Sequence, residues 1–202
     1  MRGLSATSEP DAPLGVALAA IDAANSLDPT SIVVRGKELP LALAHGRLAS
    51  DWIGKLVPDG DDALILAARA HHLRRWEVPR ASYPEGKAGY LRWRKDQKAR
   101  HARDVEALLV DAGYESSTIE RVQALIRRDG LGHDDGAQAI EDAAALAFLE
   151  TQLGDLASKL EHAHLVEVLR KTARKLSPAG LAAAATIPLD DTGRDLLREA
   201  LS

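Results

Sequence analysis

Apolar residues recur at helical spacing along nearly the whole chain, and this periodicity constrains the fold more than any other feature. Ala and Leu dominate the 46% of residues that are hydrophobic, and strong helix formers also occupy most charged positions. The only run of β-branched residues lies in the stretch 31–34, which we expect to be a loop or a brief extended piece. The pattern therefore predicts an all-α protein in which helices pack on helices.

Helix start and stop signals divide the chain into nine predicted helices. Prolines and glycines exclude helix at residues 28–29, 58–60, 77–89 and 130–136, and Asp61 or Asp62 can cap the third helix. The predicted helices cover about residues 13–26, 40–57, 62–76, 90–111, 118–129, 137–153, 156–175, 178–185 and 191–201. The long segment 77–89 between two of them is rich in proline, glycine, aromatic and basic residues, and we expect an ordered loop there.

Length and composition narrow the class of protein. We expect residues 1–12 to be a disordered tail and residues 13–202 to form one helical domain. The chain has no cysteine, which excludes disulfides, thiolate zinc sites and a cysteine nucleophile. The first residues do not resemble a secretory signal, and no apolar run approaches the roughly 18 residues that span a membrane. These features predict a cytoplasmic protein with no membrane partner.

Charge is unevenly distributed along the sequence. Residues 69–103 contain eleven Lys or Arg and only three acidic residues, whereas the rest of the chain has 15 basic and 27 acidic residues. A strongly positive segment within a negative protein indicates an anionic ligand, and the alternative is a solvated helix face. The chain does not contain the glycine-rich phosphate-binding loop of nucleotide-binding proteins, because no Gly-Lys-Ser or Gly-Lys-Thr occurs anywhere in it.

Four polar side chains fall on helix faces that are otherwise apolar. His45, His72, His101 and Asp142 each share a face with Leu, Val, Ile, Ala or Trp at spacings of three, four or seven residues. Taken singly, each is explained by a histidine bonded to a carbonyl or an aspartate paired with an arginine. Taken together, three imidazoles and one carboxylate on four helices can converge on a metal, and this donor set suits Zn, Mn or Fe.

Two further residues lie beside these candidates. His71 precedes His72 and would lie about 100° away around a helix, so it is a second ligand, a group that supports a ligand, or an exposed residue. Glu141 precedes Asp142 and faces another direction, which makes it a partner for the basic segment.

The order of these residues resembles the metal ligands of HD domains. His45, the pair His71-His72, His101 and Asp142 follow one another as the ligands do in that all-helical superfamily. The resemblance implies an HD-domain-like helical bundle and a metal-dependent phosphohydrolase, because most members act on nucleotides and related phosphates. The chain departs from the pattern in the dipeptide that names the superfamily, since the expected His-Asp is replaced here by His71-His72.

A second resemblance covers nearly the whole chain. It is similar to a bacterial and fungal family called domain of unknown function 4202. The matching pieces are Asp22-Ala-Ala-Asn25, Asp28-Pro29, His72-Leu-Arg-Arg-Trp76, Pro79-Arg80, Tyr83-Pro84, Gly89-Tyr90, Trp93-Arg94, Glu141-Asp142, Phe148-Leu-Glu150 and Lys171-Thr172. This resemblance implies a family but no established activity.

The residues and the resemblances together predict an HD-like metal-dependent hydrolase for a small phosphorylated or otherwise anionic metabolite, nucleotides included. The predicted ligands of a divalent Zn, Mn or Fe ion are His45, His72, His101 and Asp142, and the catalytic candidates are Glu141 and His71. The predicted substrate-binding residues are Arg75, Arg80, Tyr83, Tyr90, Trp93 and Arg94. The alternative is a non-catalytic module that binds an anion or RNA through the basic and aromatic loop 75–94.

Overall fold

The computed structural model describes residues 12–201, apart from the side chains of residues 155 and 158. All of the predicted tail except residue 12 therefore lies outside the described residues. The elements in chain order are α1 (Pro13–Asn25), β1 (Ser31–Val34), β2 (Lys37–Pro40), α2 (Leu41–Leu56), α3 (Asp62–Ala70), the 3-10 turns η1 (Arg75–Glu77) and η2 (Arg80–Ser82), α4 (Gly86–Asp111), α5 (Ser116–Arg127), α6 (Asp135–Lys159), α7 (His162–Ala173), α8 (Pro178–Ala184) and α9 (Asp191–Leu201). The all-α prediction is confirmed, and no helix of the described part combines the length and hydropathy needed to cross a bilayer.

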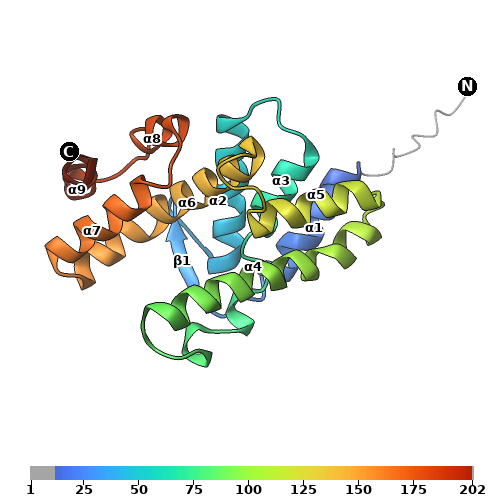
Figure 1. The fold of residues 1–202 in the computed structure, drawn as a ribbon, viewed down its shortest axis with the longest axis horizontal. Helices are drawn as coiled ribbons and strands as arrows, with labels where there is room; N and C mark the ends of the chain where they lie inside the picture. The colour runs from blue at the N-terminus through green and yellow to red at the C-terminus, as the bar shows by residue number, and fades with distance from the viewer. Residues whose placement is uncertain (1–11, 202) are drawn as a thin grey trace, which may run out of the picture.

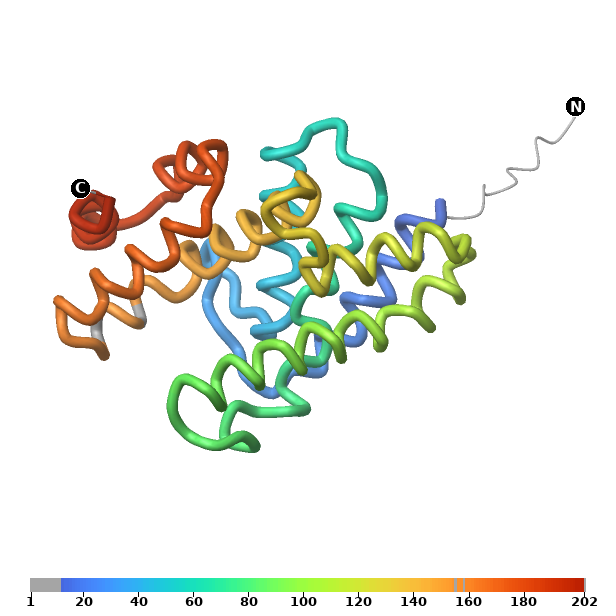
Figure 2. Tube along the Cα trace, viewed as in Figure 1, coloured from blue at the N-terminus to red at the C-terminus, as the bar shows by residue number. Residues whose placement is uncertain are grey.

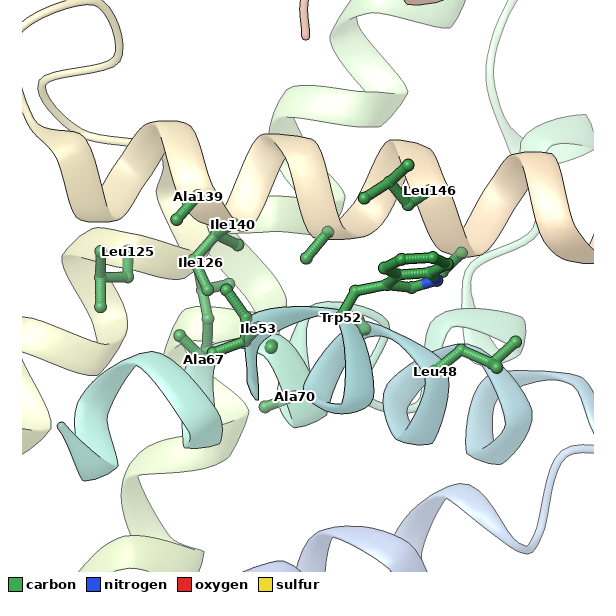
Figure 3. Close-up of a cluster of buried hydrophobic side chains, with 14 of the residues drawn as sticks. Leu48, Trp52, Ile53, Ala67, Ala70, Leu125, Ile126, Ala139, Ile140 and Leu146 are labelled. Atoms are coloured by element: carbon green, nitrogen blue, oxygen red, sulfur yellow. The ribbon is translucent and has the colours of Figure 1, made fainter. Parts of the chain in front are cut away.

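Helix α2 lies at the centre of the molecule and packs along α6, a contact between segments about 100 residues apart (Figure 1). Figure 3 shows Trp52 and Ile53 of α2 facing Ile140 and Leu146 of α6, and all four side chains are almost completely buried. Burial of apolar area of this kind supplies the main driving force for folding. The remaining helices extend to either side of this pair, with α7, α8 and α9 at one end of the molecule and α1 and α5 at the other (Figure 2).

The residues 31–34 form a strand, the first half of a short antiparallel hairpin. Ser31 pairs with Pro40 and Val34 with Lys37, and the turn between them places Arg35 and Gly36 at φ values of 50° and 77°. A two-residue turn with two positive φ angles matches the twist of a hairpin. The Nε of Arg35 then donates to Glu150 of α6 at 2.8 Å, which ties the hairpin to the central helix pair.

The junction between α2 and α3 positions the histidines of the middle segment. A Cβ on Gly46 would lie 2.5 Å from the carbonyl oxygen of Arg69, so only glycine permits this approach of the two helices. Helix α3 ends at Ala70, six residues earlier than the predicted end near residue 76. The chain instead turns at Arg74, whose φ is 52° and whose N–H donates to the buried Asn25 Oδ1 at 3.0 Å. His71 and His72 therefore leave the helix, and the helical angle expected between them does not apply.

Two other predicted boundaries were wrong. Helix α4 begins at Gly86 rather than Tyr90, immediately after Pro84 and Glu85, so part of the predicted loop is helical. Helix α6 continues to Lys159 without the predicted break near residue 154. Gly154 lies at the expected break, and a Cβ there would meet nothing within 4 Å, so this glycine serves no close approach. A single glycine costs an exposed helix only about 1 kcal/mol, which packing along α2 readily exceeds.

Candidate functional site

A cavity of about 890 Å³ lies between α4, α6, α7 and the segment that follows α3. Helix α4 presents one continuous face to it, because Lys87, Tyr90, Arg94, Lys98 and His101 are spaced three or four residues apart. The other walls contribute His45, His71, His72, Arg75, Ile126, Arg128, Glu141, Ala144, Ala145, Phe148, Gln152, His164, Val168, Lys171, Thr172 and Lys175. A cavity of this size is typical of sites for small ligands.

Three histidines meet on one side of the cavity. One ring nitrogen from each of His45, His71 and His72 lies within 4.8 Å of the others, and the rings of His71 and His72 are 4.1 Å apart between centroids. His45 and His71 are buried and His72 is half-buried. The Nδ1 atoms of His45 and His72 are separated by 3.2 Å. Two nitrogens bound to one tetrahedral zinc at 2.0–2.1 Å would be about 3.3–3.4 Å apart, so this pair already has the separation of two metal ligands.

Hydrogen bonds fix the proton on two of these rings. His71 Nδ1 lies 2.7 Å from the carbonyl oxygen of Ala68, and because a carbonyl only accepts, this nitrogen carries the proton. Thr151 donates its hydroxyl proton to the Ala147 carbonyl at 2.7 Å and therefore accepts from His45 Nε2 at 3.1 Å. His71 Nε2 and His45 Nδ1 are thus left as lone pairs, and His71 Nε2 is buried without any hydrogen-bond partner.

All three rings are neutral at physiological pH. Burial lowers the pKa of His45 to about 4, with a smaller contribution from the positive charge of Arg75. Burial also holds the pKa of His71 and of His72 well below the ordinary value of histidine. A neutral imidazole whose other nitrogen donates to a carbonyl is the form in which histidine binds metals.

His101 lies beside this trio without joining it. Its ring centroid is 6.3 Å from that of His72, and the ring is completely buried. Neither ring nitrogen makes a hydrogen bond of normal geometry, although the Leu73 backbone favours the protonated ring. Burial, followed by the charges of Arg75 and Arg100, lowers the pKa of His101 to about 3. The predicted ligand His101 is therefore near the cluster and outside the set of nitrogens close enough to share one ion.

Positive charge dominates the rest of the cavity lining. Seven cations face one carboxylate, Glu141, and the cations are Arg75, Lys87, Arg94, Lys98, Arg128, Lys171 and Lys175. Only two of the seven form an ion pair within the described residues: Arg128 with Glu141 at 3.2 Å and Lys171 with Glu167 at 3.2 Å. Five basic side chains thus line the cavity without a carboxylate partner within 4 Å.

Aromatic rings hold two of the unpaired guanidinium groups. The Cζ of Arg75 lies 4.3 Å from the centre of the Trp93 ring, and that of Arg94 lies 5.8 Å from the centre of the Tyr90 ring. These cation–π contacts orient a guanidinium but leave its N–H donors free. Burial lowers the pKa of Arg75 to about 10, with a smaller contribution from the neighbouring positive charge of Arg94.

Asp142 is not part of this site. Its carboxylate accepts from Gln138 Nε2 at 2.8 Å and from the Ser177 backbone N–H at 3.0 Å, and its other oxygen accepts the Ser177 hydroxyl at 2.5 Å. Asp142 is buried but does not line the cavity, and it joins α6 to the first turn of α8. The structure does not bring the predicted ligands Asp142, His72 and His101 together, because Asp142 belongs neither to the cavity lining nor to the group of side chains close enough to share an ion.

Three predicted substrate-binding residues also have structural contacts instead. The guanidinium of Arg80 donates to the carbonyls of Tyr83 and Pro84 at 2.9 and 2.8 Å, so it closes the loop before α4. The Tyr83 hydroxyl lies 3.0 Å from Asp96, and neither Arg80 nor Tyr83 lines the cavity. Trp93 is buried and donates its indole N–H to the Val78 carbonyl at 2.9 Å. Of the six predicted residues, Arg75, Tyr90 and Arg94 reach the cavity.

The two catalytic candidates, His71 and Glu141, both line the cavity. His71 belongs to the nitrogen trio, whereas Glu141 accepts from Arg128 Nε. Burial opposes the charge of Glu141, but Arg128 and the nearby Lys98, Arg94 and Lys175 outweigh it and hold the pKa of this carboxyl below its usual value. Glu141 is therefore ionised at neutral pH.

Sequence reasoning missed Lys98, Arg128 and Lys175. Lys98 could have been found by continuing the stripe of Tyr90 and Arg94 one turn further along α4. No local signal marks the other two, because Arg128 follows the end of α5 and Lys175 follows the end of α7, and only the packing of both helices against α6 brings them to Glu141.

The fold and the site define a helical protein with a cationic cavity and a neutral histidine cluster in its wall. The model of the family described as domain of unknown function (DUF4202) matches residues 15–197, and the chain belongs to that family. Searches of curated proteins and of solved structures found no match.

Proposed function

We propose that the protein is a metal-dependent hydrolase of a small phosphorylated metabolite, with its metal held by His45, His71 and His72. The observation that carries the proposal is the lone pair of His71 Nε2, which is buried without a partner beside two other imidazoles in the wall of a cationic cavity. A buried acceptor without a donor costs about 1–3 kcal/mol, and a metal ion would satisfy it.

The donor set fits a metal that keeps an open coordination position. Three neutral imidazoles are the protein ligands of several catalytic zinc sites, and Mn or Fe accept the same donors. When bound, such an ion lowers the pKa of a water ligand enough to supply a nucleophile near neutral pH. The carbonyl of Ala68 and the hydroxyl of Thr151 hold the His71 and His45 rings in the tautomers that binding requires.

The unpaired cations would bind the phosphoryl group. Arg75 and Arg94 each present a guanidinium with free N–H donors, and such a fork matches two phosphate oxygens. Lys98 and Lys175 also line the cavity near Glu141 and add positive charge. Mutual repulsion of these groups falls when an anion enters, so the site favours a ligand with more than one negative charge.

The same charges disfavour a divalent cation in the empty cavity. A phosphate neutralises them, so phosphate binding should strengthen metal binding, and by thermodynamic linkage metal should strengthen phosphate binding to the same degree. The likeness to HD domains remains part of the proposal, in a form where histidines replace the acidic ligands.

The RNA-binding alternative has less support from these contacts. It relies on aromatic rings free to stack on bases, yet Trp93 is buried under Arg75 and the Tyr83 hydroxyl is bound to Asp96. Tyr90 keeps an exposed ring, and one exposed ring facing a cavity favours a small ligand.

Zinc titration of chelator-treated protein, followed by calorimetry and metal analysis, tests the histidine cluster. We expect one zinc per chain, an affinity reduced at least about tenfold in His71→Ala, and no change in the control His133→Ala, whose ring lies outside the cavity. Adding inorganic phosphate should raise the zinc affinity of the wild type. Equal zinc affinity in the two variants would remove the metal from the proposal.

A matched pair of arginine variants tests the anion site on the same helix. Arg94→Ala should weaken phosphate binding and slow the hydrolysis of phosphomonoesters and nucleotides, measured as released phosphate. Arg92→Ala, whose side chain is exposed and lies 3.8 Å from Asp96, should change neither. If both variants bind phosphate as the wild type does, the cavity is not the anion site.

A further inference from the structure

Lys98 occupies an unusual position in the cavity. It lies one turn after Arg94 and one turn before His101 on the face of α4 that lines the cavity, and its side chain is half-buried. Within the described residues, its Nζ makes no hydrogen bond and no ion pair. A lysine that serves only to balance a buried carboxylate would contact it directly, as Arg128 contacts Glu141.

The surroundings of Lys98 favour a neutral amine. Burial disfavours its charged form, and Arg128, Arg94 and Lys175 add like charge, while Glu141 opposes them in part; the resulting pKa is about 8. At pH 7.5 roughly a quarter of such amines are neutral, compared with about one in a thousand for an ordinary lysine. Lysines activated by desolvation and a neighbouring cation act as nucleophiles toward carbonyl carbons.

We propose that Lys98 forms an imine with the carbonyl carbon of a phosphorylated aldehyde or ketone bound in this cavity. The lone pair of Nζ forms a bond to the carbonyl carbon, and the electron pair of the C=O bond moves to oxygen. Glu141 relays one proton from the nitrogen of this adduct to that oxygen, and the second nitrogen proton passes to the resulting hydroxyl group as its C–O bond breaks and water leaves. The product is a C=N bond, and no oxidant or reductant is consumed.

The neighbouring residues supply the specificity for a phosphorylated carbonyl compound. Arg94 on the preceding turn and Arg75, whose guanidinium lies over Trp93 of the same helix, would hold the phosphate, which places the carbonyl end of a short ligand near Lys98. The inference rests on the anion site of the proposed function, and it requires neither the histidines nor a metal.

Pyridoxal 5′-phosphate, a phosphorylated aldehyde, is a direct probe of this chemistry. The full-length protein is incubated with it at pH 7.5 in the presence of a chelator, the imine is reduced with borohydride, and the modified lysine is identified by peptide mass spectrometry. We expect Lys98 to be modified at least about tenfold faster than the exposed Lys95 on the same helix, and inorganic phosphate to suppress the reaction. Equal modification of both lysines would overturn the proposal.

Variants and a second aldehyde separate this proposal from the anion site. Lys98→Arg keeps the positive charge and should abolish the modification, whereas Lys95→Arg should leave it unchanged. If Lys98→Arg fails to fold, the peptide map of the wild-type protein still shows whether Lys98 is modified faster than Lys95. Selective modification of Lys98 by pyridoxal and its phosphate at equal rates would support the nucleophile and count against the anion site. Phosphate binding without any reaction at Lys98 would support the anion site and count against Lys98 as a nucleophile.

Discussion

Arg128 lines the cavity, but its contacts are structural. Its Nε donates to Glu141 at 3.2 Å, its Nη1 donates to the carbonyls of Leu125 and Ile126, and its Nη2 donates to that of Ile140. The residue is buried and adopts a left-handed conformation with φ of 64°. All three nitrogens of its guanidinium group therefore donate hydrogen bonds within the protein, in contrast to those of Arg75 and Arg94.

Replacing Arg128 should accordingly reduce stability. Arg128→Ala leaves the buried Glu141 without its ion-pair partner and removes three hydrogen bonds to backbone carbonyls, and we expect a loss of about 3–5 kcal/mol in the free energy of unfolding. The neighbouring Arg127→Ala removes only an exposed contact with Asp129 and should cost less than about 1 kcal/mol. Urea denaturation of the two variants measures the difference, and similar losses would show that the buried pair is not important for stability.

At the scale of elements, the junction of α2 and α3 is the contact on which the histidine cluster depends. His45 lies on α2 at this junction, next to Gly46, and His71 and His72 come directly after the end of α3. Gly46 is the residue that permits the close approach, because its missing Cβ leaves room for the Arg69 carbonyl oxygen. Gly54 lies two turns later on the same helix, where a Cβ would meet nothing within 4 Å.

The same substitution at these two glycines should have opposite effects. Gly46→Ala forces α2 and α3 apart and should destabilise the protein by about 1–3 kcal/mol, the usual cost of overpacking. Gly54→Ala should stabilise it by up to about 1 kcal/mol, because alanine favours the helix. Thermal unfolding measures both, and a stabilising effect at Gly46 would show that the two helices can separate without cost.

The sequence predicted the helices better than it predicted their ends or their partners. Helical spacing reports which face is buried, and it correctly placed His45, His101 and Asp142 inside the protein. Spacing does not report what a buried residue meets. Asp142 meets Ser177, which is 35 residues further along the chain, and no local pattern indicates that contact.

The segment after α3 shows a second limit. A helix through residue 76 would have separated His71 from His72 by about 100°, but the helix ends at Ala70 and both rings face the cavity. The stop depends on the N–H of Arg74 donating to Asn25 in α1, a contact between segments 49 residues apart. Helix propensity in the segment itself gives no sign of it.

Across the whole molecule, the buried histidines make stability depend on pH. The pKa of His101 is about 3 in the folded protein and about 6.5 in the unfolded chain, so the unfolded chain binds more protons between these values. The stabilisation is fully present above pH 6.5 and is lost as the pH falls toward 3. Each such histidine should lower the free energy of unfolding by up to about 1.4 kcal/mol per pH unit in that range.

Urea denaturation at pH 7, 6 and 5 with a chelator present measures this slope. His101→Gln should unfold with a shallower pH dependence than the wild type, whereas His133→Gln, which lies outside the cavity, should keep the slope of the wild type. A slope that is unchanged in His101→Gln would mean that this ring does not remain neutral in the folded protein.

The order in which the walls of the cavity are synthesised has a consequence for folding in the cell. His45 comes early in the chain, yet its ring is held by Thr151, 106 residues later, and Lys171 and Lys175 complete the lining of the cavity. A chain that is still being translated therefore has no complete cavity until α7 has left the ribosome, because α6 and α7 supply part of that lining. Uptake of any ligand is consequently a late event that follows completion of the fold, and shorter fragments of the chain should bind none.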